Sequence, residues 1–280
     1  AVSAYFEREP DRGDIEARLA VAAAAAGIEA PSFVLVIVPD ADWVKKSQAR
    51  FPAITAGRFE IRGSHVRKPP ARGRIAIRLD AGAAFGTGQH ETTRGCLVML
   101  SRLARRLRPA RMLDLGCGSG ILAIAMAKLW GGAKLWGGAK AWDGEIIAAD
   151  VDRLAVEVAA ANAKDNGVAD RIRLVASRGF AHPALWRGEP FDLIVANILA
   201  EPLRRLAPAL VRRLAPGGTV VLSGLVHDEK PAVVAAYAKL SVPLIDEVRL
   251  DDWSTLVLEK LPGRPRERRR GAVRPPPGSG

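Results

Sequence analysis

The stretch Asp-Leu-Gly-Cys-Gly-Ser-Gly carries the residues of this chain best suited to binding a cofactor. It begins at Asp114, places glycines at Gly116, Gly118 and Gly120, and follows apolar residues typical of a buried strand. Glycine lets the backbone approach a ligand closely and adopt positive φ. The first N–H groups of a following helix lack backbone partners and can bind polar ligand atoms. The pattern therefore predicts a nucleotide-like cofactor site between a strand and a helix.

The spacing of the glycines indicates which cofactor binds. Nicotinamide sites usually show G-x-G-x-x-G, which binds a pyrophosphate, but here Ile121 stands where the third glycine of that pattern would be. The carboxylate of Asp114 would repel a pyrophosphate and tolerate a cation. S-adenosylmethionine carries a sulfonium and an ammonium group and no phosphate. The turn therefore favours S-adenosylmethionine, and a nicotinamide dehydrogenase is the least favoured alternative.

A second acid, Asp150, ends the next predicted strand, 34 positions after Gly116. A ribose-binding acid is expected about 20 residues beyond such glycines. Between them the hexapeptide Ala-Lys-Leu-Trp-Gly-Gly occupies 127–132, recurs at 133–138 and returns in altered form at 139–144. Two six-residue units account for twelve of the 34 positions and leave 22. We interpret the repeat as a local duplication in a helix-to-strand connection, with a tryptophan-bearing binding loop as the alternative, and Asp150 as the ribose-binding acid.

The loop before the cofactor strand is rich in special residues. Residues 80–93 place three glycines and three threonines around His90, which predicts a wall of the ligand site. We interpret His90 as a hydrogen-bonding residue at the start of a helix, with a catalytic base as the alternative. Thr93 caps that helix or contacts a ligand through its hydroxyl group.

Strands that alternate with helices must position these residues. Their order predicts an open, mostly parallel α/β sheet. Strands are expected at 112–115, 145–150, 171–175, 191–196 and 219–223, a final hairpin at 242–250 and 255–259, and helices at 152–166, 202–214 and 228–240.

Upstream residues predict a smaller and incomplete α/β domain. A helix is expected at 14–26, strands at 2–7 and 32–38, and a helical segment at 42–50. We divide the chain into a partial α/β domain (1–50), a linker (51–72), the cofactor-binding domain (73–260) and a disordered tail rich in arginine and proline (261–280). Strands are also expected at 59–62 and 74–79.

Composition limits the class of protein. The 280 residues carry a formal net charge of +12, and residues 263–280 hold six arginines against one glutamate. That charge favours nucleic acid as a contact or serves solubility alone. Two cysteines, Cys96 and Cys117, cannot form a disulfide framework. No apolar run approaches the roughly 20 residues of a membrane span, and we expect no signal peptide. We expect a cytoplasmic, monomeric protein without a membrane contact, and no residue is assigned to a metal.

Four motifs together resemble class I S-adenosylmethionine-dependent methyltransferases, and specifically the PrmA-type family that methylates ribosomal protein L11. The loop Phe-Gly-Thr-Gly-Gln-His-Glu-Thr-Thr and the segment Ala-Asn-Ile-Leu-Ala-Glu-Pro-Leu are more specific than the glycine turn. The matching stretches are 84–93, 114–124, 150–152 with 162–167, and 196–203. The resemblance implies a Rossmann-like fold with a seven-stranded, mostly parallel sheet and helices on both faces.

The resemblance also implies roles for individual residues. Thr93, Asp114, Gly116, Gly118, Gly120, Asp150 and Asn197 would contact the cofactor. Asn197, with a following backbone carbonyl, would accept hydrogen bonds from the target amine and aim its lone pair at the methyl group. His90 is a second catalytic candidate. The implied partner is ribosomal protein L11, methylated on lysine side chains, on its N-terminal amine, or on both.

Three features depart from the family pattern: the short N-terminal domain, the hexapeptide repeat, and the basic tail, which would add weak affinity for ribosomal RNA. Two alternatives stay open. One is a related methyltransferase that acts on another protein or on a small-molecule amine. The other is an RNA-binding protein with a vestigial methyltransferase fold.

Overall fold

The computed structural model describes residues 6, 10–36, 53–63, 66, 68–79, 90–131 and 142–262. The chain divides into two compact units, Ala1–Trp43 and Val44–Gly280. Among the described residues, no helix has the length and apolar character needed to cross a membrane.

The described part of the first unit contains one helix, α1 (Arg12–Ala26). Its cap is Asp11, whose side chain accepts a hydrogen bond from Asp14 N at 2.9 Å, and Gly27 closes it in the left-handed conformation. The helix thus begins two residues before the predicted start, because the acid three positions earlier reaches the free N–H group.

The strand predicted at 32–38 was wrong for its described part. Residues 32–36 form no strand, and Val34 is 83% exposed. A strand needs a neighbour to satisfy its backbone hydrogen bonds, and this segment pairs with no other described residue. Apart from Phe6, the strand predicted at 2–7 lies outside the described residues, as does the helical segment at 42–50.

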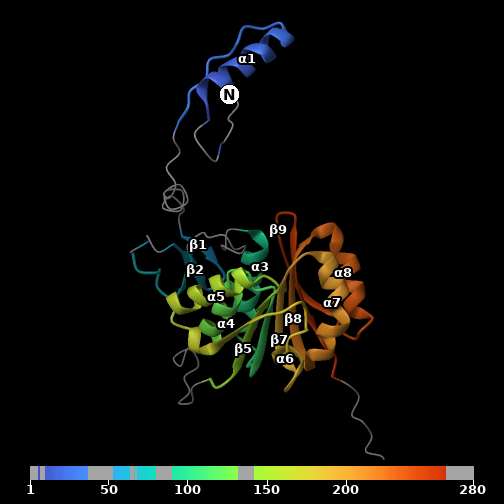
Figure 1. The fold of residues 1–280 in the computed structure, drawn as a ribbon. Coiled ribbons are helices and arrows are strands. Elements are labelled where there is room, and N and C mark those ends of the chain that lie inside the picture. The colour runs from blue at the N-terminus through green and yellow to red at the C-terminus, as the bar shows by residue number, and fades with distance from the viewer. Residues whose placement is uncertain are drawn as a thin grey trace, which may run out of the picture. The chain divides into compact units, whose positions relative to one another are not determined.

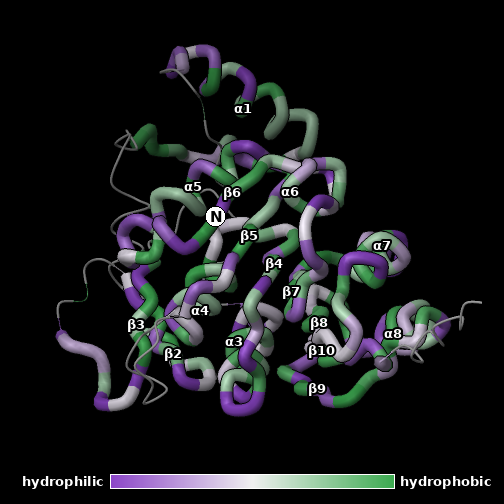
Figure 2. Tube along the Cα trace, turned by 90° about the horizontal axis from the view of Figure 1, so that it is seen from below, coloured by the Kyte–Doolittle hydropathy of each residue, from purple (hydrophilic) through white to green (hydrophobic). Residues whose placement is uncertain are grey.

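In the described part of the second unit, seven strands form one sheet (Figure 1). Their order is β6-β5-β4-β7-β8-β10-β9, which can be followed on the labels of Figure 2. The first five run parallel, and β10 pairs antiparallel with both β8 and β9. The mostly parallel sheet predicted from the sequence is therefore confirmed. The strands are β4 (Arg111–Leu115), β5 (Glu145–Asp150), β6 (Ile172–Ala176), β7 (Phe191–Asn197), β8 (Leu214–Val226), β9 (Leu244–Leu250) and β10 (Trp253–Glu259).

Helices cover both faces of this sheet, as Figure 2 shows. Alternate residues of each central strand serve opposite faces: Met112 and Ile146 pack with α3, α4 and α5, whereas Leu113 and Ile147 pack with α6, α7 and α8. Burial of both faces explains why the strands read as continuous apolar runs. The helices are α3 (Glu91–Leu103), α4 (Ile121–Trp130), α5 (Arg153–Asp165), α6 (Pro183–Trp186), α7 (Ala200–Arg213) and α8 (Lys230–Ala238).

Strand β8 is longer than the sequence predicted. It begins at Leu214, which pairs with Phe191 of β7, and a register shift after Phe191 accommodates the Pro-Gly-Gly segment. At its other end β8 continues past Ser223, because Val226 pairs with Trp253 of the hairpin. Pairing with two neighbours therefore extends the strand at both ends.

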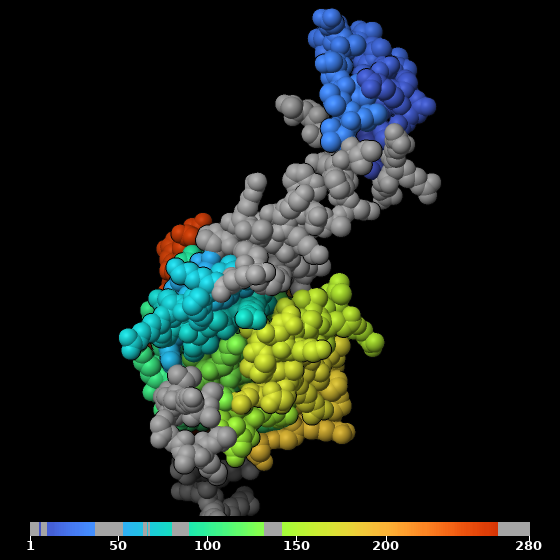
Figure 3. Space-filling model, turned by 90° about the vertical axis from the view of Figure 1, so that its left-hand side faces the viewer, coloured from blue at the N-terminus to red at the C-terminus, as the bar shows by residue number. Residues whose placement is uncertain are grey.

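The second unit also contains a smaller, three-stranded sheet. It consists of β1 (Ile54–Ala56), β2 (Phe59–Arg62) and β3 (Ile75–Arg78). Its buried Phe59 and Ile77 join the core beside α3 and α4. Figure 3 shows residues 53–79 in cyan against the green and yellow surface of the larger sheet's helices. The segment that we interpreted as a linker therefore contains strands β1 and β2, and both lie in the larger unit.

The side chain of Asn166, just after α5, ties this small sheet to the large one. Its Oδ1 accepts from Arg78 N at 2.9 Å, and its Nδ2 donates to Arg78 O at 2.7 Å. One amide thereby imitates a neighbouring strand and satisfies both backbone groups at the end of β3.

The hexapeptide repeat begins inside a helix. Residues 127–130 form the last turn of α4, and residues 132–141 lie outside the described part of the chain. Trp130 donates from Nε1 to Leu107 O at 3.1 Å, and Trp142 donates to Pro109 O at 2.8 Å. Residues 127–130 of the first copy belong to α4, and the later residues of the repeat fall in the connection to β5, where the sequence placed it.

Candidate active site

The predicted site residues meet where the parallel strands end. Leu115 of β4 lies opposite Ala149 of β5 and Ala196 of β7, and Asn197 lies opposite Ser223 of β8. The residues that follow these strands therefore share the carboxyl edge of the sheet, where open α/β sheets bind ligands.

The three glycines of the turn after β4 all have positive φ, at 76° for Gly116, 51° for Gly118 and 80° for Gly120. A Cβ atom at Gly116 would lie 2.4 Å from Ile198 Cγ2, and one at Gly120 would lie 2.9 Å from Ala159 Cβ. Side chains at these two positions would collide with neighbouring elements. The turn therefore presents bare backbone at the sheet edge, next to the segment that contains Asn197.

Asp150 ends β5 and holds the glycine turn. Its Oδ2 accepts from Gly118 N at 2.8 Å, and its Oδ1 accepts from Asp152 N at 3.0 Å. The acid and the turn are thus in contact despite the 34 positions between Gly116 and Asp150. This contact is the one expected once the repeat is removed from the spacing.

Asp114 is fully buried beneath the turn. Its Oδ2 accepts from Ala123 N at 2.9 Å and caps the first turn of α4, where Gly120 has no side chain to do so. Its Oδ1 is buried without a hydrogen-bond partner. Burial raises the pKa of this carboxyl to about 7, the Asp150 charge acts in the same direction, and the bond from Ala123 opposes them. Its cofactor contact stays a prediction.

Asn197 at the end of β7 lies next to Thr93 in α3. The Asn197 Nδ2 donates to Thr93 Oγ1 at 3.3 Å, while its Oδ1 is buried and has no hydrogen-bond partner among the described residues. An unpaired buried acceptor is costly, so it marks a place where a ligand donor would be stabilised. The structure thus brings together two residues that the sequence proposed separately.

His90 caps α3. Its Nδ1 accepts from Thr92 N at 3.3 Å and lies 2.9 Å from Thr92 Oγ1, and its ring packs edge-to-face on Trp253 with centroids 4.8 Å apart. The interpretation as a hydrogen-bonding residue at the helix start is confirmed. A role as catalytic base stays a prediction, and the cap already uses Nδ1 as an acceptor. The rest of its loop, 80–89, lies outside the described residues.

A buried hydroxyl cluster supports Asn197 and was missed by the sequence analysis. Ser223 Oγ lies 2.8 Å from Thr255 Oγ1 and 3.3 Å from Thr92 O, so it joins β8, β10 and α3. The only signal in the sequence was a Ser-Gly pair at the end of an apolar strand, which we took as the end of that strand.

Cys117 lies inside the glycine turn but is not a nucleophile. Its side chain is buried and free of any disulfide. Burial, together with the charges of Asp114 and Asp150, raises the pKa of the thiol. It therefore stays protonated at neutral pH and fills space, as predicted.

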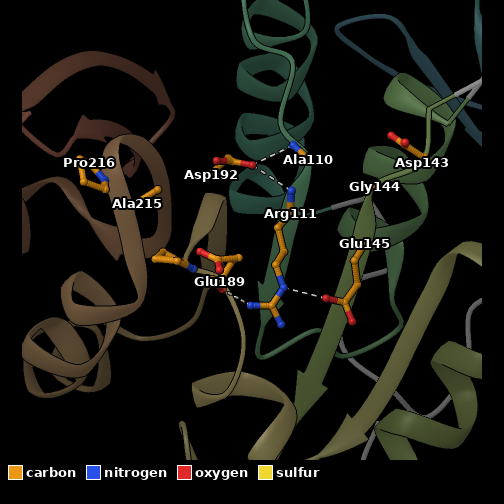
Figure 4. A pocket seen from close by; sticks show the side chains of 10 residues that line it. Ala110, Arg111, Asp143, Gly144, Glu145, Glu189, Asp192, Ala215 and Pro216 are labelled. Carbon is orange, nitrogen blue, oxygen red and sulfur yellow. Dashed lines mark hydrogen bonds and ion pairs between the residues drawn. The ribbon is translucent and has the colours of Figure 1, made fainter. Parts of the chain in front are cut away.

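A pocket of about 630 Å³ lies at the opposite, amino edge of the sheet. Its residues are engaged with one another (Figure 4): Asp192 Oδ2 accepts from Ala110 N and Arg111 N, and Arg111 Nε donates to Glu145 at 2.7 Å. These contacts fasten the starts of β4, β5 and β7. The polar residues of this pocket therefore hold the strands together, and the pocket lies at the opposite edge of the sheet from the predicted site.

Comparison with known proteins agrees with this geometry. Residues 1–261 match the family described as "Ribosomal protein L11 methyltransferase (PrmA)". A relative of that name from Bradyrhizobium diazoefficiens is 40% identical over 260 residues, which cover 93% of this chain and 83% of the relative. A second, from Mesorhizobium japonicum, is 42% identical over 258 residues, which cover 92% and 84%.

A solved structure supports the same assignment. The ribosomal protein L11 methylase from Lactobacillus delbrueckii subsp. bulgaricus superimposes with a TM-score of 0.64 at 32% identity, and covers 75% of this chain and 100% of that one. The Rossmann-like methyltransferase fold implied by the motifs is therefore confirmed. This chain belongs to the ribosomal protein L11 methyltransferase (PrmA) family.

Proposed function

We propose that this protein transfers methyl groups from S-adenosylmethionine to amino groups of ribosomal protein L11. Membership of the family and the printed names of its relatives support the substrate. The observation that carries the chemistry is the buried, unpartnered Oδ1 of Asn197, which lies next to the turn that would hold the cofactor. Methylation on lysine side chains, on the N-terminal amine, or on both is part of the proposal.

The residues at the sheet edge fit this cofactor. The glycine turn offers backbone with no room for a Cβ at Gly116 or Gly120, Asp150 stands at the expected place for ribose hydroxyl groups, and Asp114 contributes a buried carboxyl with an open acceptor. This set has carboxylates where a pyrophosphate would need positive charge. When bound, the cofactor supplies an electrophilic methyl group on a sulfonium.

The role of Asn197 follows from its position. Its Oδ1 would accept one hydrogen from the target amine, and the carbonyl of the next residue, Ile198, would accept another. Two acceptors fix the direction of the amine lone pair, and such orientation contributes up to several kcal/mol to lowering a barrier. The hydrogen bond from Nδ2 to Thr93 keeps Oδ1 turned toward the amine.

The amine must be neutral to attack. A lysine side chain has a pKa of about 10.4 in water and is charged at neutral pH. Transfer of the amine from water into the protein would lower that pKa, because burial disfavours the charged form. We assign no general base, and His90 remains the candidate beside the site.

Two further parts of the proposal concern the partner. Residues 1–50 would contribute to recognition of ribosomal protein L11, with 73–260 as the catalytic domain. The basic residues after 263 would add weak, salt-sensitive affinity for ribosomal RNA. We further propose that the enzyme acts as a monomer in the cytoplasm.

The experiment compares substrates under one set of conditions. The purified protein is incubated with labelled S-adenosylmethionine and either ribosomal protein L11 or a series of small-molecule amines. Transfer to the ribosomal protein is expected, and Asn197→Ala should abolish at least 90% of it while cofactor binding by calorimetry persists. A small-molecule amine that is methylated faster would favour the related-methyltransferase alternative. Absence of cofactor binding, with salt-sensitive RNA binding, would favour the vestigial fold.

A further inference from the structure

We propose that Gly224 of β8 is a positioning residue that sets the Ile198 carbonyl as the second acceptor for the target amine. The inference rests on the proposed function and adds a residue that neither the motifs nor the family match assigns. It concerns the backbone carbonyl of Ile198, the residue after Asn197, which would help to direct the amine lone pair at the methyl group.

The backbone of Gly224 touches the Ile198 peptide directly. Gly224 has φ of 86°, a conformation that L side chains rarely adopt. A Cβ atom there would lie 2.4 Å from Ile198 O, 2.7 Å from Ile198 C and 2.9 Å from Ile198 N. These are backbone atoms, so they cannot swing aside as a flexible side chain would. Any residue other than glycine must displace the carbonyl.

The Ile198 peptide is also held from other directions. Its N–H donates to Ser223 O at 3.1 Å, and the preceding Asn197 pairs with Ser223 in the sheet. On its other side, Ile198 Cγ2 lies 2.4 Å from the place a Cβ of Gly116 would occupy. Ile198 is thus clamped between two positive-φ glycines, one in β8 and one in the cofactor turn. The Gly224 contact is with backbone atoms of Ile198, whereas the Gly116 contact is with the end of its side chain.

Displacement of this carbonyl should slow transfer while leaving the cofactor site intact. A neutral primary amine has two N–H groups, and two fixed acceptors leave its lone pair pointing in one direction. A misplacement of about 1 Å can reduce a rate about 100-fold. The three atoms nearest to a Cβ at Gly224 all belong to Ile198 and none to Asp150 or the glycine turn, so cofactor affinity should change little.

Strand β8 offers a matched control. Gly217 also has positive φ, 72°, but nothing lies within 4 Å of a Cβ built there. Alanine at either position imposes similar backbone strain within the same strand, and only Gly224→Ala creates the collision with Ile198. The pair therefore separates a positioning effect from a general loss of stability.

The experiment measures kcat and KM for ribosomal protein L11, the cofactor dissociation constant, and thermal unfolding for both variants. Gly224→Ala is expected to lower kcat at least tenfold with the cofactor dissociation constant within about twofold of wild type. Gly217→Ala should keep kcat within about twofold. A folded Gly224→Ala enzyme with wild-type kcat would overturn the proposal.

A second measurement covers the case in which Gly224→Ala does not fold. A crystal structure of the wild-type protein with S-adenosylhomocysteine and a lysine-containing peptide of ribosomal protein L11 should show the Ile198 carbonyl oxygen within hydrogen-bond distance of the target amine; a carbonyl that makes no contact with the amine would overturn the proposal. If wild-type protein fails to methylate ribosomal protein L11, the proposed function fails instead. The positional claim is then decided by crystal structures, which should show the Ile198 carbonyl displaced in Gly224→Ala and unmoved in Gly217→Ala.

Discussion

The Asn197 Nδ2 donates to Thr93 Oγ1 at 3.3 Å across 104 positions of sequence. The bond joins the end of β7 to the first turn of α3. It fixes which end of the amide faces Thr93 and leaves Oδ1 as a buried, unpaired acceptor. A helix that lies before the cofactor turn in the chain thereby orients the group proposed to bind the amine.

Removal of the Thr93 hydroxyl should impair transfer. Thr93→Val keeps the shape and loses the acceptor for Asn197, so we expect kcat to fall about tenfold, equivalent to about 1.4 kcal/mol of barrier. Thr93→Ser keeps the hydroxyl and should retain most of the rate. Steady-state kinetics with ribosomal protein L11 measures both. A rise in KM for the cofactor alone, with kcat unchanged, would assign the hydroxyl to cofactor binding instead.

Neutralisation of Asp150 should weaken cofactor binding. Asp150→Asn neutralises the side chain whose Oδ2 accepts from Gly118 N of the glycine turn, whose Oδ1 accepts from Asp152 N, and which would bind ribose hydroxyl groups. Hydrogen bonds to charged groups contribute about 1.5–3 kcal/mol, so the dissociation constant should rise about 10- to 100-fold by calorimetry. Asp152→Asn is the matched control, because it removes the same charge two residues away and Asn still caps α5. Equal loss in both variants would contradict the assignment.

The buried carboxyl of Asp114 should make stability depend on pH. Its pKa is raised to about 7 in the folded state, against about 3.9 in an unfolded chain. Between these values the folded state binds more protons, so rising pH lowers the free energy of unfolding through this group. That cost is absent below pH 4 and complete above pH 7.

Asp114→Asn cannot ionise and should escape this cost. The variant should therefore gain free energy of unfolding relative to wild type as the pH rises from 4 to 8, measured by urea unfolding at several pH values. Parallel profiles for the two proteins would show that the Asp114 carboxyl is already ionised in the folded state at low pH.

The hexapeptide duplication should be dispensable. Deletion of Ala133–Gly138 removes one of two identical copies and restores a shorter connection, so we expect a free energy of unfolding within about 0.5 kcal/mol of wild type and unchanged cofactor affinity. Trp130→Ala should behave differently, because this side chain is 2% exposed and donates to Leu107 O. Loss of a buried tryptophan costs about 3–5 kcal/mol. A deletion as damaging as Trp130→Ala would assign the repeat a structural role.

Several parts of the site could be predicted because local pattern determines them. The glycines of the turn have positive φ, which few other residues tolerate. Asp150 ends an apolar strand 34 positions after Gly116, and this spacing becomes the expected one when the repeat is subtracted. The predicted hairpin at 242–250 and 255–259 is confirmed as β9 and β10, and the helix predicted at 152–166 is confirmed as α5. The same reasoning gave a wrong prediction at 32–38, of which residues 32–36 are described and form no strand. β-branched residues indicate a strand but do not supply the neighbouring strand with which it must pair.

The sequence by itself determined the succession of strands and helices along the chain, the cofactor turn, and the family to which its motifs point. It did so because periodicity, glycine and capping act over a few residues. The tertiary structure alone decided that Thr93 orients Asn197, that Asp114 caps α4, and that Gly224 abuts Ile198. The contacts of Asn197 and Ile198 depend on the spatial order of the strands, which sets β7 between β4 and β8. No local pattern encodes that order, because it arises from how all the apolar faces of the sheet are buried together.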